Sequence, residues 1–206
     1  NNDGLKIYRT QSPKSYSNQN LDIKLEKFLK LITSNSAKYS IVKDIHSSLN
    51  IENYTHATSP LRRIVDLINQ ELYHNSKSQI IDVFSIDKIN DTNKILKKCY
   101  REMNKIALAH DVYNNESYET RCYIYDFNIE KGNSYLYFPD ENISIKHNLV
   151  NYKLDKYYNL SVEGDEIILE LGENIKKIRM NKLLNVTLYG RPNIYDIDKS
   201  LLIDIN

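Results

Sequence analysis

Apolar residues recur at every third or fourth position in the first half of the chain, with polar residues between them. This spacing puts the apolar side chains on one face of a helix. Four segments follow it, and the predicted helices span about 21–32, 37–49, 61–74 and 92–112. We therefore expect the first half to be mainly helical.

Near residue 115 the pattern changes from helical spacing to alternation of apolar and polar positions. Residues 121–127 and 134–138 alternate and are rich in tyrosine and β-branched residues, which is typical of strands joined by a hairpin turn. Four further segments also read as strands, at 166–171, 177–180, 185–189 and 201–205. Several short strands separated by turns favour a small antiparallel barrel or sandwich. The predicted fold class is α+β, with a mainly helical part at 1–115 and a β part at 116–206.

Composition narrows the class of protein. The chain has 206 residues, 41% hydrophobic and 27% charged, which is the balance of an ordinary globular protein. A formal net charge of +1 excludes a polycation that holds nucleic acid by total charge, so a basic surface must come from local clustering.

The apolar runs, the cysteines and the first residue of the chain bear on where the protein is located and on whether the chain is a fragment. No run approaches the roughly 18 apolar residues of a membrane span, and no signal peptide is visible, so no membrane association is expected. Cys99 and Cys122 lie far apart, which favours a reducing compartment and a cytoplasmic location. The chain does not begin with Met, which hints at a fragment or a processed product.

The most informative run, residues 54–67, reads YTHATSPLRRIVDL. Its composition predicts a helix start, in which Thr58 or Ser59 caps the helix and Pro60 occupies its first turn. Exposed amides and the helix dipole favour an anion there, and Arg62 and Arg63 add planar donors that suit phosphate. A cap followed by two arginines is also a good helix start in any protein.

Helical geometry separates the two arginines. On a helix from Leu61, the apolar stripe faces the core, Arg62 lies at the edge of that stripe, and Arg63 points nearly away from it. We therefore predict that Arg62 is aimed into a cleft, with Asp66 one turn on to orient either guanidinium. The apolar stripe consists of Leu61, Ile64, Val65, Ile68 and Leu72.

Tyr54 and His56 precede this helix and share a face if their segment is extended. They can then stack on a base or bond a phosphate. Half-buried packing for Tyr54 and a structural role for His56 are the alternatives.

The run closely resembles the signature of the RNB (RNase II / RNase R) family of exoribonucleases, Tyr-x-His-Phe-Thr-Ser-Pro-Ile-Arg-Arg-Tyr-x-Asp-Leu. Further positions resemble the family at Ala37-x-Tyr39, at His46-x-x-Leu49 and, more weakly, at Ile7-Tyr8-Arg9 with Pro13, so the matches cover about residues 7–75. Two features depart from the family. Ser47-Ser48 replaces Phe-Gly, and the aspartate cluster Asp-x(5)-Asp-x-Asp-Asp is missing from this chain.

The resemblance implies the C-terminal part of a processive hydrolytic 3′→5′ exoribonuclease that releases nucleoside 5′-monophosphates from single-stranded RNA. It implies Mg²⁺ as cofactor, with aspartate ligands outside this chain, and either the N-terminal remainder of the enzyme or a complementing chain as partner. Residues 1–115 would be the C-terminal portion of the RNB domain and 116–206 an OB-type RNA-binding barrel. A non-catalytic RNA-binding or scaffold module and one half of a split nuclease remain open.

The same resemblance suggests roles for individual residues. Arg62 is expected to contact the scissile or adjacent phosphate and to stabilise charge in the transition state. The expected RNA-binding residues of this run are Tyr54, His56, Thr58, Ser59 and Arg63.

The last predicted helix carries a basic stripe of Lys94, Lys98, Arg101 and Lys105. This stripe is either a solvated helix face or the lining of an RNA channel, for which Lys98, Arg101 and Lys105 are the RNA-binding candidates. The other side of the helix is apolar, with Leu96, Cys99, Met103 and Ile106. Glu102 is the only acidic residue within 94–105 and receives no assigned role.

The β part offers a further candidate surface. Its first two strands can form a platform on which bases stack, or their tyrosines can be ordinary strand residues. The residues concerned are Arg121, Tyr123, Tyr125, Tyr135 and Tyr137.

Overall fold

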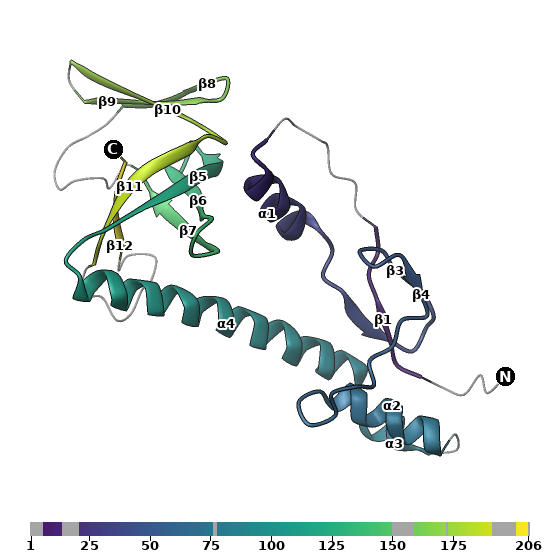
Figure 1. Cartoon of the computed structure of the whole chain (residues 1–206). Coiled ribbons are helices and arrows are strands. Elements are labelled where there is room, and N and C mark those ends of the chain that lie inside the picture. Colours follow the sequence, from purple (N-terminus) through teal and green to yellow (C-terminus); the bar gives the residue numbers. More distant parts are fainter. Residues whose placement is uncertain are drawn as a thin grey trace. The chain divides into compact units, whose positions relative to one another are not determined.

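The computed structural model describes residues 6–13, 21–75, 78–149, 159–171, 173–190 and 201–205. The chain forms two compact units. Asn1–Asn18 and Lys30–Lys98 make the first, and Gln19–Leu29 and Cys99–Asn206 make the second. Helices α1 (Ile23–Thr33) and α4 (Ile86–Asn114) each contribute residues to both units (Figure 1).

The first unit combines short strands with helices. Strand β1 (Tyr8–Thr10) pairs antiparallel with β2 (Lys38–Ser40), and β3 (Ile45–His46) pairs antiparallel with β4 (Ile51–Glu52). Helices α2 (Ile64–His74) and α3 (Ile80–Val83) follow. The buried core of this unit consists of Ile7, Tyr39, Val65, Ile68 and Leu72.

The helix predicted over 37–49 is wrong, because this segment forms β2 and β3. Asn90 of α4 holds the backbone of Tyr39 extended, accepting its N–H at 2.8 Å and donating to its carbonyl at 2.9 Å. Ile41 and Val42 are exposed, so the predicted apolar face has nothing to bury against. With four short strands present, a mainly helical first part is not confirmed.

The second unit contains a five-stranded and a three-stranded antiparallel sheet. The larger sheet has the order β12-β11-β5-β6-β7 and the smaller one the order β10-β9-β8. The strands are β5 (Tyr118–Asn128), β6 (Asn133–Phe138), β7 (Ile143–Asn148), β8 (Asn159–Glu163), β9 (Glu166–Leu171), β10 (Asn174–Arg179), β11 (Leu183–Gly190) and β12 (Leu201–Ile205). All six predicted strands are present, whereas β7 and β8 were not predicted. The pairings among the described strands close neither sheet into a barrel, so the OB-type barrel is not confirmed.

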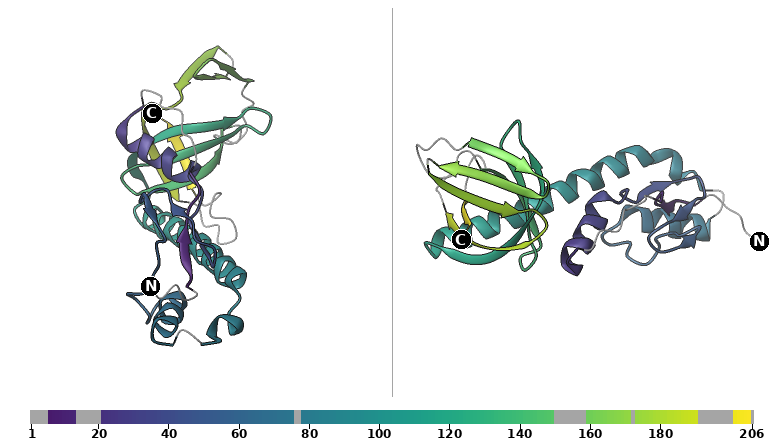
Figure 2. Two further views of the ribbon diagram at one scale, coloured as in Figure 1. Left: turned by 90° about the vertical axis from the view of Figure 1, so that its right-hand side faces the viewer. Right: turned by 90° about the horizontal axis from the view of Figure 1, so that it is seen from above.

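One face of the larger sheet carries the main apolar core. Cys122 and Ile124 of β5 lie on this face with Leu108 and Val112 of α4. Residues of the smaller sheet, including Ile167, join the same core, and Figure 2 shows that sheet lying across the larger one. The unit is therefore a layered structure whose interior is closed by the C-terminal half of α4.

The opposite face of β5 and β6 carries the tyrosines, and α1 covers them. Tyr123 and Tyr137 are 2% and 6% exposed and share a cluster with Leu25 of α1. The Phe28 ring stacks on Tyr137, with ring centroids 3.8 Å apart. These rings are occupied by packing, so the stacking-platform interpretation is wrong for them.

Candidate nucleic-acid interface

Helix α2 holds the segment that precedes it in a defined position. The buried side chain of Asn69 accepts the Ile7 N–H at 2.8 Å and donates to the carbonyls of Ile7 and His56, both at 2.9 Å. Gln70 donates to the carbonyl of Ala57 at 2.7 Å. Two adjacent amide side chains of one helix therefore fix the backbone on which the predicted binding residues stand.

Helix α2 begins at Ile64, three residues later than predicted. Its N-cap is Arg63, in an extended conformation with φ −130° and ψ 110°, and no side chain caps the helix. Thr58 is exposed, and neither it nor Ser59 acts as the cap. The predicted cap and the helical position of Pro60 are therefore wrong.

A buried carboxylate explains the late start. Asp66 is completely buried, and its Oδ2 accepts the backbone N–H of Ser59 at 2.7 Å. The chain turns back between these residues, with the N–H groups of Arg62 and Arg63 both donating to the Ser59 carbonyl. The two arginines consequently lie in a tight turn before the helix, not on its first turn.

This turn reverses the expected environments of the two arginines. Arg63 Nη2 donates to Asp66 Oδ2 at 2.9 Å, and this bond raises the pKa of the Arg63 guanidinium. Arg62 is exposed, and its guanidinium makes no hydrogen bond or ion pair with any described residue. Leu61, expected on the core stripe, is fully exposed. The structure therefore holds Arg63 in place and leaves Arg62 free to bind a ligand.

Aromatic and cationic side chains form a continuous cluster beside this turn. The rings of His46, Tyr54, His56 and Tyr39 contact one another in that order, edge to face, with centroids 5.5, 5.2 and 5.7 Å apart. At the Tyr39 end, the Arg9 guanidinium lies 4.7 Å from the ring centroid, a cation–π distance. We call these five residues the ring cluster.

The protonation of His56 follows from its neighbours. Burial and, secondarily, the positive charges of Arg63 and Arg9 lower the pKa of His56, so its imidazole is neutral near pH 7. Burial raises the pKa of Tyr39, whose hydroxyl lies 2.9 Å from His56 Nδ1. The protonated hydroxyl can donate to Nδ1, which leaves the imidazole proton on Nε2 as a donor for an oxygen of a ligand.

The sequence assigned site roles to Tyr54 and His56 but not to the other members of the ring cluster. Arg9, Tyr39 and His46 belong to positions flanking the central run, where the family resemblance was the only available signal. Helical or strand periodicity cannot place them, because three separate strands, β1, β2 and β3, bring them to one place.

The residues of the predicted basic stripe on α4 differ in exposure and in ion pairing. Lys98 and Arg101 are exposed, and neither forms an ion pair with a described residue. The Lys105 side chain is only 15% exposed and lies 3.5 Å from Glu102. Lys98 and Arg101 therefore offer free positive charge, whereas that of Lys105 is partly neutralised.

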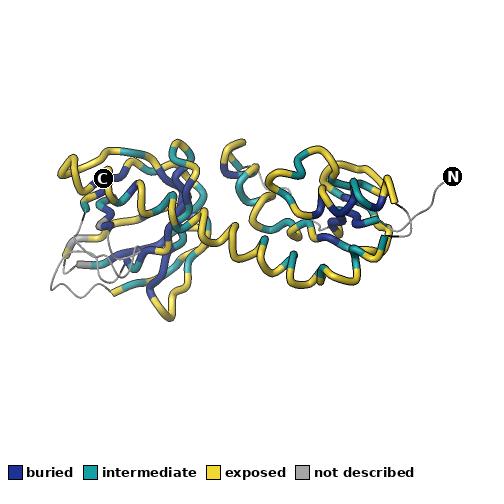
Figure 3. Tube along the Cα trace, turned by 90° about the horizontal axis from the view of Figure 1, so that it is seen from below, coloured by how far each residue is buried: buried dark blue, intermediate teal, exposed yellow. Residues whose placement is uncertain are grey.

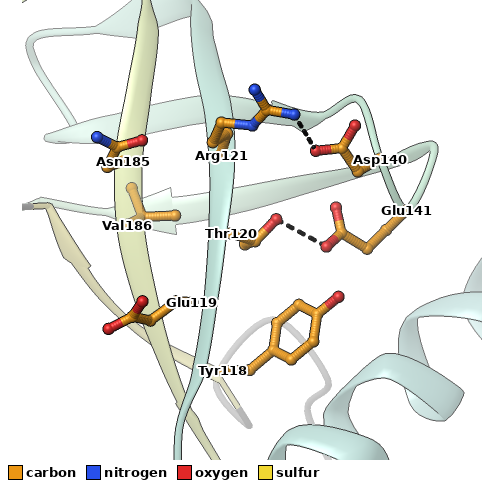
Figure 4. Close-up of a pocket in the computed structure, with 8 residues that line it drawn as sticks. All are labelled: Tyr118, Glu119, Thr120, Arg121, Asp140, Glu141, Asn185 and Val186. Atoms are coloured by element: carbon orange, nitrogen blue, oxygen red, sulfur yellow. Dashed lines mark hydrogen bonds and ion pairs between the residues drawn. The ribbon is translucent and has the colours of Figure 1, made fainter.

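The second unit contains a cavity of about 520 Å³ whose lining, unlike the ring cluster, is mainly acidic in charge. Arg121 pairs with Asp140 at 2.9 Å, and Thr120 donates to Glu141 at 2.7 Å (Figure 4). Together with Glu119, carboxylates outnumber the single cation here. This lining repels phosphate, so the ring cluster and its turn are the better nucleic-acid candidate.

Neither a metal site nor a membrane span is found in the residues that the structure describes. They contain no group of three or more His, Cys, Asp or Glu side chains that can hold a metal ion. Of the described helices, none combines the length and apolar character that a bilayer span needs.

Comparison with known proteins finds an RNB domain in the first part of the chain. Residues 5–79 match the family model described as RNB domain. Mycoplasma genitalium RNase R in complex with ribose-methylated single-stranded RNA has a TM-score of 0.66 and 18% identity, and its apo form 0.61 and 17%. The Dss1 exoribonuclease of Candida glabrata, as the active-site mutant D477N, has a TM-score of 0.62 and 15% identity.

The structural matches cover nearly all of this chain but only a minor part of each longer protein. The match to each RNase R structure covers 100% of this chain and 38% of the RNase R chain. The match to Dss1 covers 97% of this chain and 25% of the Dss1 chain. Among curated proteins, none matches this chain significantly. The family resemblance read from the sequence is confirmed, and the chain corresponds to a minor part of the longer enzymes.

Proposed function

We propose that this chain, which belongs to the RNB family through residues 5–79, is the C-terminal part of a processive 3′→5′ exoribonuclease. It would hydrolyse single-stranded RNA to nucleoside 5′-monophosphates. Residues 1–115 would complete the RNB domain, residues 116–206 would form an OB-type RNA-binding part, and the enzyme would be cytoplasmic.

One observation carries the proposal: the turn of the RNB signature presents an unpaired arginine beside an anchored one. Asp66 holds Arg63, and Arg62 lies exposed next to it without an ion-pair partner among the described residues. A phosphate that enters here finds a guanidinium that loses no existing partner on binding. We therefore assign Arg62 to the scissile or adjacent phosphate, where it stabilises developing charge.

The ring cluster supplies neutral contacts next to these charges. Nε2–H of His56 is a donor for a phosphate or ribose oxygen, and the Tyr54 ring offers a surface to a base. Thr58, exposed beside them, and Ser59 add hydroxyl groups, while Lys98, Arg101 and Lys105 extend positive charge along α4. Binding by such groups is independent of RNA sequence and sensitive to salt.

The described residues do not fit a magnesium site, because they contain no group of three or more His, Cys, Asp or Glu side chains that could hold a metal ion. We therefore assign the expected Mg²⁺ ligands to aspartates outside the described residues and attribute no step of the reaction to the metal here. The part played by this chain is to bind, orient and stabilise the phosphate.

The same observation favours an alternative, a non-catalytic RNA-binding module or one half of a split nuclease. Release of nucleotides separates these possibilities. The complete protein, incubated with Mg²⁺ and 5′-labelled single-stranded RNA, is expected to release nucleoside 5′-monophosphates and to shorten the RNA from its 3′ end. RNA binding without any shortening would reject the exoribonuclease and leave the binding module. Activity that needs a second polypeptide would identify the split enzyme.

A further inference from the structure

Helix α4 exposes a row of apolar side chains along its C-terminal half. Met103, Ile106 and Tyr113 are 65%, 52% and 54% exposed, and Cys99 is exposed as well. Successive members are separated by four, three and seven residues, so they lie on one side of the helix. We call this row the α4 seam. On the same helix, Leu96 lies one turn before Cys99 and is 60% exposed.

The α4 seam is not the side of the helix that faces the core of its own unit. Leu108 and Val112 are 7% and 0% exposed and pack into that core. At about 100° per residue, Leu108 lies about 160° and Val112 about 120° around the helix from Ile106, so both face away from the α4 seam. The helix is therefore apolar on two opposite sides, of which the described chain buries only one, and Figure 3 shows the middle of α4 largely exposed.

The basic stripe lies on the side of α4 opposite the α4 seam. Lys105 and Arg101 project on the same side as Leu108 and Val112, so the stripe continues the inner side of α4. The apolar side opposite the stripe is exposed. A helix with two apolar sides is typical of one packed between two bodies. A contiguous exposed apolar surface likewise marks an interaction site.

We infer that the α4 seam docks the remainder of an RNB domain, an inference that rests on the proposed function. The chain accounts for 38% of the length of the RNase R structures, although the whole of it is matched by them. The larger part of such an enzyme therefore has no counterpart among these residues, and it is the body available to cover the second side of α4.

A second copy of this chain is the competing occupant, and the pattern disfavours it. Even with Leu96 added, the row to Tyr113 spans about two and a half heptads, shorter than the three to four that mark a coiled coil. It also places His110, whose side chain is 70% exposed, between Ile106 and Tyr113. A self-paired helix would gain little from this row.

The two cysteines make the seam directly measurable. Cys99 is exposed on the seam, whereas Cys122 is 0% exposed and burial raises the pKa of its thiol to about 12. At pH 8, a thiol reagent such as DTNB is therefore expected to modify only Cys99 rapidly in the purified chain. The same assay then reports whether the seam is covered.

The test mixes the purified chain with a second polypeptide. This polypeptide is the RNB-domain segment, encoded in the same genome, that carries the aspartate cluster. We expect a one-to-one complex by light scattering, with Cys99 modified at least about tenfold more slowly than in the chain alone. Met103→Glu combined with Ile106→Glu is expected to weaken the complex at least about 100-fold, because both charges would be buried. Ile129→Glu with Ile175→Glu is the matched control, since these side chains are 50% and 61% exposed elsewhere on the unit.

Several outcomes would overturn the inference. They are the absence of a complex, a complex in which Cys99 reacts as fast as before, and equal weakening by the seam and control variants. A dimer of the chain alone with a protected Cys99 would assign the seam to a second copy instead. A complex with a protected Cys99 that releases no nucleotides would reject the proposed function while leaving the docking surface intact, and an active complex with a reactive Cys99 would do the opposite.

Discussion

The guanidinium of Arg63 lies 2.9 Å from the carboxylate of Asp66, a side chain with no exposed surface. The same carboxylate oxygen accepts the N–H of Ser59 seven residues earlier. One buried acid thus folds the signature turn and anchors one of its two arginines. The neighbouring Arg62 is left exposed for a ligand.

Replacement of Arg63 is therefore expected to lower stability, whereas replacement of Arg62 is expected to lower the reaction rate. Arg63→Ala leaves the buried Asp66 without its cation and should lower the free energy of unfolding by about 2 kcal/mol in urea titrations. Arg62→Ala should change stability by less than about 0.5 kcal/mol. In the complete enzyme it should lower kcat by about 10²–10³-fold with a much smaller change in RNA affinity. Proportional loss of kcat and affinity would argue against a transition-state role for Arg62.

The free cations of α4 predict a change in salt dependence. Combined replacement Lys98→Ala and Arg101→Ala should reduce the slope of log K against log salt by about 1.4, since each contact with single-stranded RNA contributes about 0.7. Fluorescence anisotropy of a labelled oligouridylate over a salt series measures this slope. Lys27→Ala with Lys38→Ala removes two exposed lysines that lie outside both α4 and residues 116–206, and it should leave the slope unchanged. Equal slopes for both double variants would remove α4 from the RNA path.

Stability should fall in mild acid because of His147. Burial lowers the pKa of this imidazole to about 4, against 6.5 for an ordinary histidine. The unfolded chain therefore takes up a proton before the folded one, and stability present above pH 6.5 is lost progressively as pH falls to about 4. The loss should amount to about 3 kcal/mol, measured by urea unfolding at successive pH values. His147→Gln should flatten the curve over this range, and an unchanged curve would contradict the assignment.

Gly190 marks the contact between β11 and the end of α4. A Cβ atom at this position would lie 2.5 Å from the Cα of Tyr113, so Gly190→Ala should lower the free energy of unfolding by about 2 kcal/mol. Gly164 is the control, since nothing lies within 4 Å of its Cβ position and only its φ of +62° constrains it. Asparagine tolerates that conformation, so Gly164→Asn should be nearly neutral, whereas Gly190→Asn should cost at least as much as alanine. Thermal melts of these three variants distinguish a steric clash at Gly190 from the backbone constraint at Gly164.

The sequence by itself determined the elements whose periodicity matches their final environment. The strands Glu166–Leu171 and Leu201–Ile205 were predicted with the bounds that the structure has, and the change to β structure near residue 115 follows the end of α4 at Asn114. In these segments, alternation reports directly which side chains a sheet can bury. The RNB signature could also be recognised from the sequence, because it is a continuous run of residues.

Tertiary structure alone decided the features that depend on partners far along the chain. Asn69 binds Ile7 across 62 residues, and Asn90 holds Tyr39 across 51, which makes a strand where spacing predicted a helix. The buried carboxylate of Asp66 likewise moved the helix start, and it anchors Arg63 where the spacing predicted an anchored Arg62. Local spacing shows which side chains share a face, but not which distant group will cover it or bond to it. That choice rests on the free energy of burying and pairing groups that only the folded chain brings together.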